Sequence, residues 1–157
     1  MNKPTIVKKD GFMVVGLKYR GKNEQNEVPQ LWQSLMPVAN QIRHIVPHGA
    51  IYGIMDNYDE TTGEFDYIAG FEVSQLANIP RGMVGVAVPA RTYAVFEATL
   101  ATLREAYNYA YQWLPMAAYE SVPGPEFEMY DETFDPHDPD SLLYIYLPVK
   151  QRIPVVA

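Results

Sequence analysis

The chain contains no cysteine, and this absence removes several kinds of chemistry. It excludes disulfides, thiolate ligands for a metal and cysteine nucleophiles. The sequence also lacks an apolar run long enough to cross a bilayer. Its first residues meet charge and turn residues before any stretch of signal-peptide length. We therefore expect a cytoplasmic protein that does not enter the membrane.

Positive charge is scarce as well. Lys and Arg number 12 against 19 Asp and Glu, which gives a net charge of −7. A negative protein is repelled by the phosphates of nucleic acid, so we expect no direct contact with DNA or RNA. The same field favours cations, although an acidic surface also serves solubility alone.

Motifs for cofactors, metals and nucleophilic catalysis are missing. The sequence has no glycine-rich phosphate loop and no nucleophile elbow. His44 and His48 are four residues apart, but Pro47 interrupts the helix that would align them. His137 lies in a turn rich in Asp and Pro. From the sequence we therefore predict no cofactor and no metal, and we identify no catalytic residue.

What the chain does contain is apolar and aromatic residues, at 48% and 13%, enough for one domain over residues 1–157. Their periodicity predicts the order strand, helix, strand, strand twice over. The expected strands are 5–21 (broken at Asp10 and Gly11), 50–56, 65–73, 91–97, 126–130 and 142–149; the expected helices are 29–45 (kinked at Pro37) and 99–114; residues 74–89 form a linker. This order predicts an α+β fold of duplicated βαββ units, at about 1–75 and 85–150. Pseudo-twofold symmetry would then place a central ligand groove at their seam.

A carboxylate stands within the apolar strand at 126–130. Alternation puts Phe127 and Met129 on one face, and Glu128 and Tyr130 on the other. If the first face packs under a helix, Glu128 and Tyr130 point into the groove. Burying a carboxylate costs several kcal/mol unless a cation, hydrogen bonds or a proton compensates it. Glu128 and Tyr130 are therefore candidate ligands for a cationic molecule.

The last strand offers two tyrosines in alternation with aliphatic residues. Tyr144 and Tyr146 share a face opposite Ile145 and Leu147. Aromatic faces attract cations by about 0.5–2 kcal/mol each. We predict that both tyrosines line the cation site beside Glu128; the alternative is that they cover a half-exposed sheet face.

Three further residues are candidates for the groove. Glu72 alternates with apolar neighbours beside Gly70, and is interpreted as a second carboxylate or as a solvated strand residue. Trp32 and Trp113 flank the apolar stripes of their helices, as groove walls or as fillers at the edge of the core. Tyr107 lies within its stripe, which favours a place in the core.

Five stretches in this order resemble a known family: YIAGFEV at 67–73, VPARTYAVF at 88–96, YAYQWLP at 109–115, GPEFEMY at 124–130 and IYLPV at 145–149. Together they resemble the GyrI-like small-molecule-binding domain, also called the AraC or bacterial-transcription-activator effector-binding domain. The resemblance covers nearly the whole chain.

The resemblance implies a duplicated βαββ fold with a hydrophobic groove. In multidrug-sensing members, an acidic residue and aromatic side chains grip lipophilic cations in this groove, and Glu128 stands at the position of the acidic residue. Because the effector domain takes up almost every residue, we expect a stand-alone member. A role in transcription would then require a partner protein that carries a DNA-binding domain.

Three functions remain open at this point. The first, which we favour, is a binding module that senses or sequesters bulky amphipathic cations of the drug or dye type. The second is a hydrolase of electrophilic small molecules that uses a groove Glu and Tyr, as the resemblance implies for one branch of the family. The third is a protein-binding module like the gyrase inhibitors of the family, in which the acidic surface would matter more than the groove.

Overall fold

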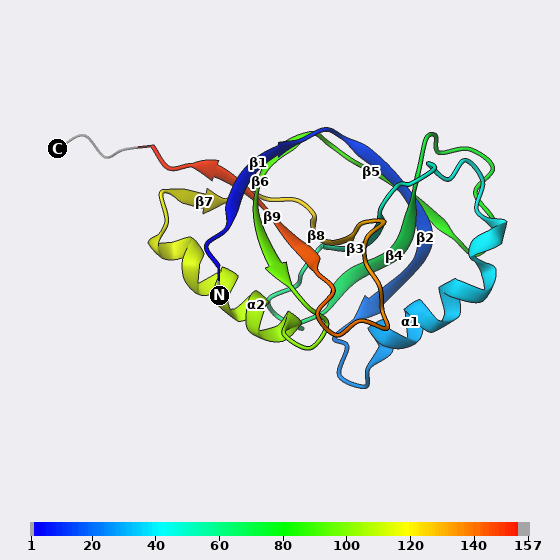
Figure 1. The fold of residues 1–157 in the computed structure, drawn as a ribbon, viewed down its shortest axis with the longest axis horizontal. Coiled ribbons are helices and arrows are strands. Elements are labelled where there is room, and N and C mark those ends of the chain that lie inside the picture. The colour runs from blue at the N-terminus through cyan, green and yellow to red at the C-terminus, as the bar shows by residue number, and fades with distance from the viewer. Residues whose placement is uncertain (1, 154–157) are drawn as a thin grey trace.

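The protein is described by a computed structural model that covers residues 2–153 (Figure 1). Its strands are β1 (Thr5–Lys9), β2 (Phe12–Gly21), β3 (Ile51–Asp56), β4 (Phe65–Val73), β5 (Val84–Val88), β6 (Arg91–Ala98), β7 (Tyr119–Ser121), β8 (Glu126–Tyr130) and β9 (Leu143–Gln151). The helices are α1 (Glu27–Leu35) and α2 (Leu103–Trp113), each followed by a short 3-10 helix, η1 (Met36–Gln41) and η2 (Leu114–Met116). Within residues 2–153, neither helix has the length and apolar character needed to cross a membrane.

The fold is α+β and consists of two βαββ units, as the sequence predicts. The first unit is β2-α1-β3-β4 and the second is β6-α2-β8-β9. All ladders are antiparallel, and the strands run in the order β6-β9-β8-β3-β4-β2. The last two strands of one unit thus mirror those of the other, with β8 and β3 at the centre. At this seam Glu128 lies directly opposite Gly53.

A long ribbon of two strands closes the sheet on itself. In it, Thr5 pairs with Val95 and Phe12 pairs with Val88, so β1 with β6 and β2 with β5 follow one continuous register. Pairing lapses around Gly11 and Pro89, where proline has no N–H to donate. The ribbon joins the two ends of the sheet, which therefore curls into the ring seen in Figure 1.

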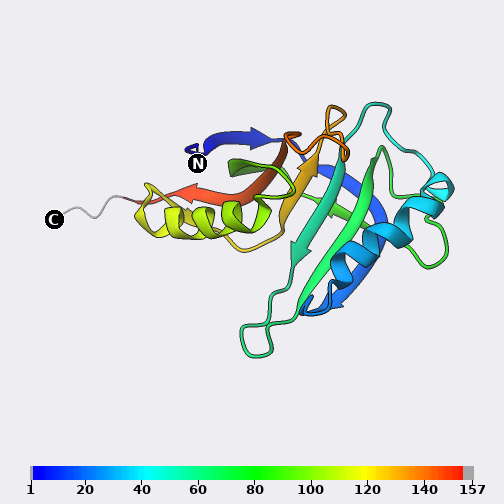
Figure 2. The same ribbon diagram turned by 60° about the horizontal axis from the view of Figure 1, so that its bottom comes forward.

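The ring has two faces that differ in what covers them. The inner face points into the ring and buries one core cluster, made of Phe12, Val14, Tyr52, Ile54, Val88, Tyr93 and Phe127. The outer face carries both helices, and we call it the helix face (Figures 1 and 2). There α1 packs against β2 and β4, whereas α2 packs against β6. The central strands β8 and β3 lie between the two helices.

Phe127 and Met129 do not pack under a helix, which was the condition for Glu128 and Tyr130 to face a groove. Phe127 is fully buried in the inner cluster, and Met129 packs against the same cluster. The helices lie on the face of Glu128 instead. Alternation in β8 correctly separates the two sets of side chains, but it cannot show which side the helices cover.

Smaller differences concern local backbone chemistry. The predicted linker at 74–89 contains the strand β5, and the strand β7 was not predicted from the sequence. The predicted helix from 29 to 45 ends as an α-helix at Leu35 and continues as η1, because Pro37 cannot donate to the α-helical ladder. The chain passes Pro115 in the same way within η2.

Close approach of β2 and β4 requires glycine at a directly opposed pair, Gly16 and Gly70. A Cβ atom at Gly16 would lie 1.9 Å from the carbonyl oxygen of Ala69. We predict that Gly16→Ala lowers the free energy of unfolding by about 3 kcal/mol, because the backbones must move apart. Urea denaturation measures this change. As a control, Gly63→Asn should be nearly neutral, since nothing lies near a Cβ there and Asn tolerates its positive φ; equal losses in both variants would contradict the steric argument.

Candidate functional site

A buried carboxylate occupies the middle of the helix face. Glu128 projects from β8 between α1 and α2, and it is only 5% exposed. The strand around it alternates, so its neighbours Phe127 and Met129 point into the ring. The duplicated fold therefore brings one acidic side chain to the pseudo-symmetry seam, between the two helices.

Three tyrosine hydroxyls donate to this carboxylate. Tyr107 from α2 donates to Oε2 over 2.8 Å. Tyr67 from β4 and Tyr130 from β8 donate to Oε1 over 2.9 and 3.2 Å. The donors come from both repeats, so the carboxylate joins the two halves. We call this group of four side chains, Glu128 and the three tyrosines around it, the phenol ring; the term does not mean a single aromatic ring.

Two residues complete the surroundings of the phenol ring. The indole Nε1 of Trp32, on α1, donates to the hydroxyl of Tyr67 over 3.0 Å, and the Trp32 ring meets the Tyr130 ring edge-on at 5.7 Å. Gly53 leaves the space that the Tyr67 hydroxyl fills, because a Cβ there would lie 2.0 Å from this oxygen. The position of the Tyr67 hydroxyl thus requires a glycine at residue 53.

The charge of Glu128 has no cationic partner. No Lys, Arg or His forms an ion pair with it within residues 2–153. Burial raises the pKa of Glu128, and the hydrogen bonds from Tyr107, Tyr67 and Tyr130 offset part of this rise. Burial, together with the nearby carboxylate, likewise raises the pKa values of Tyr67 and Tyr107. The phenols therefore remain protonated and donate.

A second carboxylate lies two residues away on the same face. Glu126 accepts a hydrogen bond of 2.6 Å from Tyr111, which stacks on Tyr107 one helical turn earlier. Burial raises the pKa of Glu126; the Tyr111 hydrogen bond lowers it, and the charge of Glu128 raises it further. Glu126 thus lies on the same face as Glu128, and it is not among the site residues predicted from the sequence.

Glu126 and Tyr111 line a hollow of about 770 Å³ that lies beside the phenol ring. The other lining residues are Met55, Asp56, Asn57, Tyr58, Glu60, Phe65, Ser121 and Gly124. This lining contains three carboxylates and three aromatic rings, and no lysine or arginine. We call it the acidic hollow. Met55 also touches the Tyr107 hydroxyl through its sulfur at 3.9 Å, which connects the hollow to the phenol ring.

The structure brings together three of the seven predicted site residues: Glu128, Tyr130 and Trp32. The predicted position of Tyr144 and Tyr146 beside Glu128 is wrong. Tyr146 pairs with Phe127 and Tyr144 with Met129, so both tyrosines lie on the inner face. Paired residues of an antiparallel ladder share a face, and this register was not readable from either strand alone.

Glu72 and Trp113 also lie away from the phenol ring. Glu72 pairs with Val14 on the inner face, where its Oε1 is 3.5 Å from the backbone N of Ala50. Trp113 packs edge-on against Phe96 at 5.7 Å, in the core beneath α2. Of the two interpretations of Trp113, a groove wall or a filler at the edge of the core, the structure agrees with the second.

The inner face carries an aromatic cluster with its own cation. The Lys9 Nζ atom lies 5.0, 5.7 and 5.9 Å from the ring centres of Phe12, Tyr52 and Tyr146. Burial lowers the pKa of Lys9, while the charge of Glu72 raises it. The expected attraction of Tyr146 for a cation is thus met by a lysine of the same chain.

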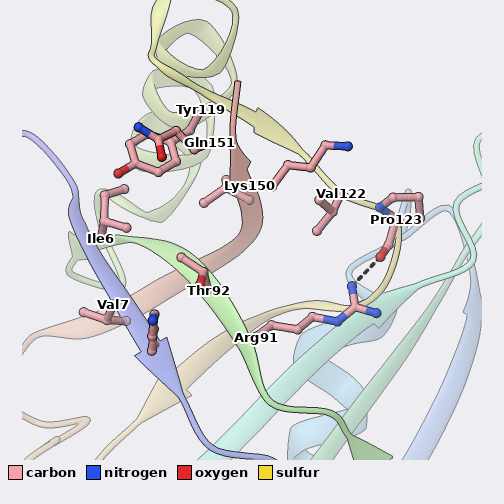
Figure 3. Close-up of a pocket in the computed structure, with 11 residues that line it drawn as sticks. Ile6, Val7, Arg91, Thr92, Tyr119, Val122, Pro123, Lys150 and Gln151 are labelled. Atoms are coloured by element: carbon pink, nitrogen blue, oxygen red, sulfur yellow. Dashed lines mark hydrogen bonds between the residues drawn. The ribbon is translucent and has the colours of Figure 1, made fainter. Parts of the chain in front are cut away.

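A second hollow, of about 730 Å³, lies where β1, β6 and the end of β9 meet. Figure 3 shows its lining, in which Arg91 donates to the carbonyl oxygen of Pro123. Lys8 and Lys150 also line it. Its charge is therefore opposite to that of the acidic hollow, and it does not suit a cationic ligand.

Comparison with known proteins assigns the class. Residues 5–149 match the family model of Cass2, the integron-associated effector binding protein, and the chain belongs to this family. An integron cassette protein from the mobile metagenome of Vibrio cholerae has a similar structure, with a TM-score of 0.70 and 19% identity over 94% of this chain and 96% of that one. SAV2435, in a structure bound to tetraphenylphosphonium, has a TM-score of 0.76 with 18% identity over 95% and 94%.

The chain is also related to a longer protein. It is 36% identical over 148 residues to the transcriptional regulator BrlR of Pseudomonas aeruginosa. The match covers 92% of this chain and 54% of BrlR, so the chain spans about half the length of that relative. These matches identify a GyrI-like effector-binding domain, in agreement with the family resemblance of its sequence.

Ionisation of Glu128 costs the folded state free energy, because its pKa is raised above the ordinary 4.5. The folded state then holds this proton to higher pH than the unfolded state, so stability falls as pH rises from about 4.5 through the raised pKa. We predict that Glu128→Gln gains stability relative to wild type by about 1 kcal/mol or more between pH 4 and pH 8. Chemical denaturation at several pH values measures this gain. A difference between the two proteins that does not change with pH would contradict it.

Proposed function

We propose that this protein binds bulky amphipathic cations in the groove of the helix face, as a cytoplasmic sensor or sequestering module. One observation carries the proposal: Glu128 is a buried carboxylate with phenol donors around it and, among the described residues, no ion-pair partner. Such a charge is costly in a protein interior. A cation that reaches it gains an ion pair in a medium of low dielectric constant.

The surroundings of Glu128 suit a cation that is also apolar. The carboxylate is surrounded by aromatic side chains. Three of them, Tyr67, Tyr107 and Tyr130, hydrogen-bond to it directly, and Trp32 hydrogen-bonds to Tyr67. Aromatic faces attract large cations more strongly when water is excluded. In our proposal the ligand displaces the hydroxyls of Tyr107 and Tyr130 from the carboxylate, and the acidic hollow receives its apolar body.

The comparisons support this proposal at the level of the family. SAV2435 shares the fold, and its structure is of the complex with tetraphenylphosphonium, a lipophilic cation. BrlR is named a transcriptional regulator. We infer that cation binding by this chain serves transcription through a DNA-binding partner, because its own net charge of −7 opposes binding to DNA.

Hydrolysis is the competing function, and the raised pKa of Glu128 favours it, since a general base works best near neutral pH. The phenol ring argues against it. A carboxylate has about four acceptor positions, and three hydroxyls already occupy Glu128. Unless a substrate displaces these hydroxyls, little of the carboxylate is left to activate a water molecule. Turnover of an electrophilic ester or epoxide that Glu128→Gln abolishes would establish hydrolysis instead.

Tetraphenylphosphonium is the probe that tests the proposal. We expect saturable binding in the micromolar range by isothermal titration calorimetry, and weaker binding of neutral triphenylphosphine oxide. Glu128→Gln should weaken the cation about tenfold or more and the neutral compound far less, because only the cation loses an ion pair. Glu105→Gln, an exposed change of equal charge on α2, is the matched control. Equal weakening of both compounds by Glu128→Gln would refute the electrostatic role.

The affinity for this cation should also depend on pH. Protonation of Glu128 removes the charge that attracts the ligand, and tetraphenylphosphonium itself does not titrate. Because burial raises the pKa of Glu128, the affinity should begin to fall at a higher pH than for an ordinary glutamate and should continue to fall as the solution becomes more acidic. Calorimetric titrations from pH 8 to pH 5 follow this loss. The Glu128→Gln variant should show a much flatter dependence, and an equally steep one would exclude Glu128 as its source.

A further inference from the structure

The groove contains two carboxylates on one strand, and only one of them is closed off. Glu126 and Glu128 are alternate residues of β8, so both side chains point to the helix face. Alternate residues of a strand are separated by about 7 Å. Glu128 lies inside the phenol ring, whereas Glu126 lines the acidic hollow.

Both carboxylates lack a cation of their own. Within residues 2–153, neither Glu126 nor Glu128 forms an ion pair. Each is held by tyrosines of α2 instead: Tyr111 donates to Glu126 and Tyr107 donates to Glu128. The two tyrosines stack at 6.1 Å with an angle of 24° between their planes. Two parallel rings thus stand opposite two carboxylates along one wall of the groove.

The acidic hollow provides space at the outer carboxylate. Its 770 Å³ is of the size of small-molecule sites, and it adjoins the phenol ring through Met55 and Tyr107. Tyr111 is 48% exposed, so its ring can turn away without unpacking the core. Asp56 and Glu60 add negative charge to the lining. A ligand seated on Glu128 would therefore extend past Glu126 into an acidic, aromatic space.

From this geometry we propose that the groove selects dications: elongated aromatic molecules whose two positive groups are about 7 Å apart, one held by Glu128 and the other by Glu126. This inference rests on the proposed function, because Glu128 must first accept a cation. It adds a second charge to the ligand and assigns Glu126 as the residue that selects for it. A dication pairs both carboxylates at once, whereas a monocation of the same shape leaves the half-buried Glu126 without a cation.

Two commercially available molecules of nearly the same shape test the proposal. Methyl viologen has two methylpyridinium rings joined end to end, and N-methyl-4-phenylpyridinium replaces one charged ring by phenyl. We expect calorimetry at low ionic strength to give about tenfold tighter binding of methyl viologen. Glu126→Gln should reduce the ratio of the two dissociation constants to nearly one, because the amide keeps the size of the side chain and loses its charge. Glu105→Gln should leave the ratio as it is in wild type.

The outcomes separate this proposal from the proposed function. If tetraphenylphosphonium and N-methyl-4-phenylpyridinium bind in a manner dependent on Glu128, but methyl viologen binds no more tightly, the groove is a monocation site and the dication proposal is wrong. The same conclusion follows if Glu126→Gln and Glu105→Gln reduce the ratio equally, since the preference would then come from net charge. If none of the three cations binds, both proposals fail.

Discussion

The hydrogen bonds between the carboxylate of Glu128 and three tyrosines are the constraint on which the groove depends. They hold a charge that the surrounding protein does not neutralise, and they connect β4 of the first repeat with α2 and β8 of the second. Each donor is itself buried or half-buried. Among the described residues, hydrogen bonds and no cation hold this carboxylate in the interior, and hydrogen bonds stabilise its charged form less than a cation would. A site of this kind favours a ligand that brings the missing charge.

On each face of the sheet aromatic rings surround a charged group, and the two groups have opposite charges. On the inner face, Phe12, Tyr52 and Tyr146 surround the ammonium group of Lys9, so the protein supplies its own cation. On the helix face the aromatic rings surround a carboxylate, and no lysine or arginine approaches it within residues 2–153. The carboxylates of the helix face are therefore a charge for an external cation to match. The aromatic side chains alone would not have distinguished the two faces.

Sequence patterns predicted what depends on neighbouring residues and failed where distant strands decide. Alternation in β8 identified Glu128 and Tyr130 as partners on one face, and Pro37 placed the break in the first helix. The assignment of Tyr144 and Tyr146 to that face failed, because the register between β8 and β9 fixes their side. Tyr67 was missed because the pairing of β3 with both β4 and β8 brings it near Glu128. Tyr107 was assigned to the core, because its helical stripe does not show that its hydroxyl reaches β8. For Glu126 a local signal existed: it is two residues from Glu128 in the same strand, and alternation alone puts both on one face.

The ribbon that closes the ring has a consequence for how the chain reaches this structure. Thr5 pairs with Val95, so the first strand finds its partner only about ninety residues later. During synthesis, the first βαββ unit leaves the ribosome before the partner of β1 exists. Pairings between such distant residues form slowly, because a long loop must close before any contact forms. We therefore expect β1 to dock late in folding, and until then the edge of β6 is open to strands of other molecules.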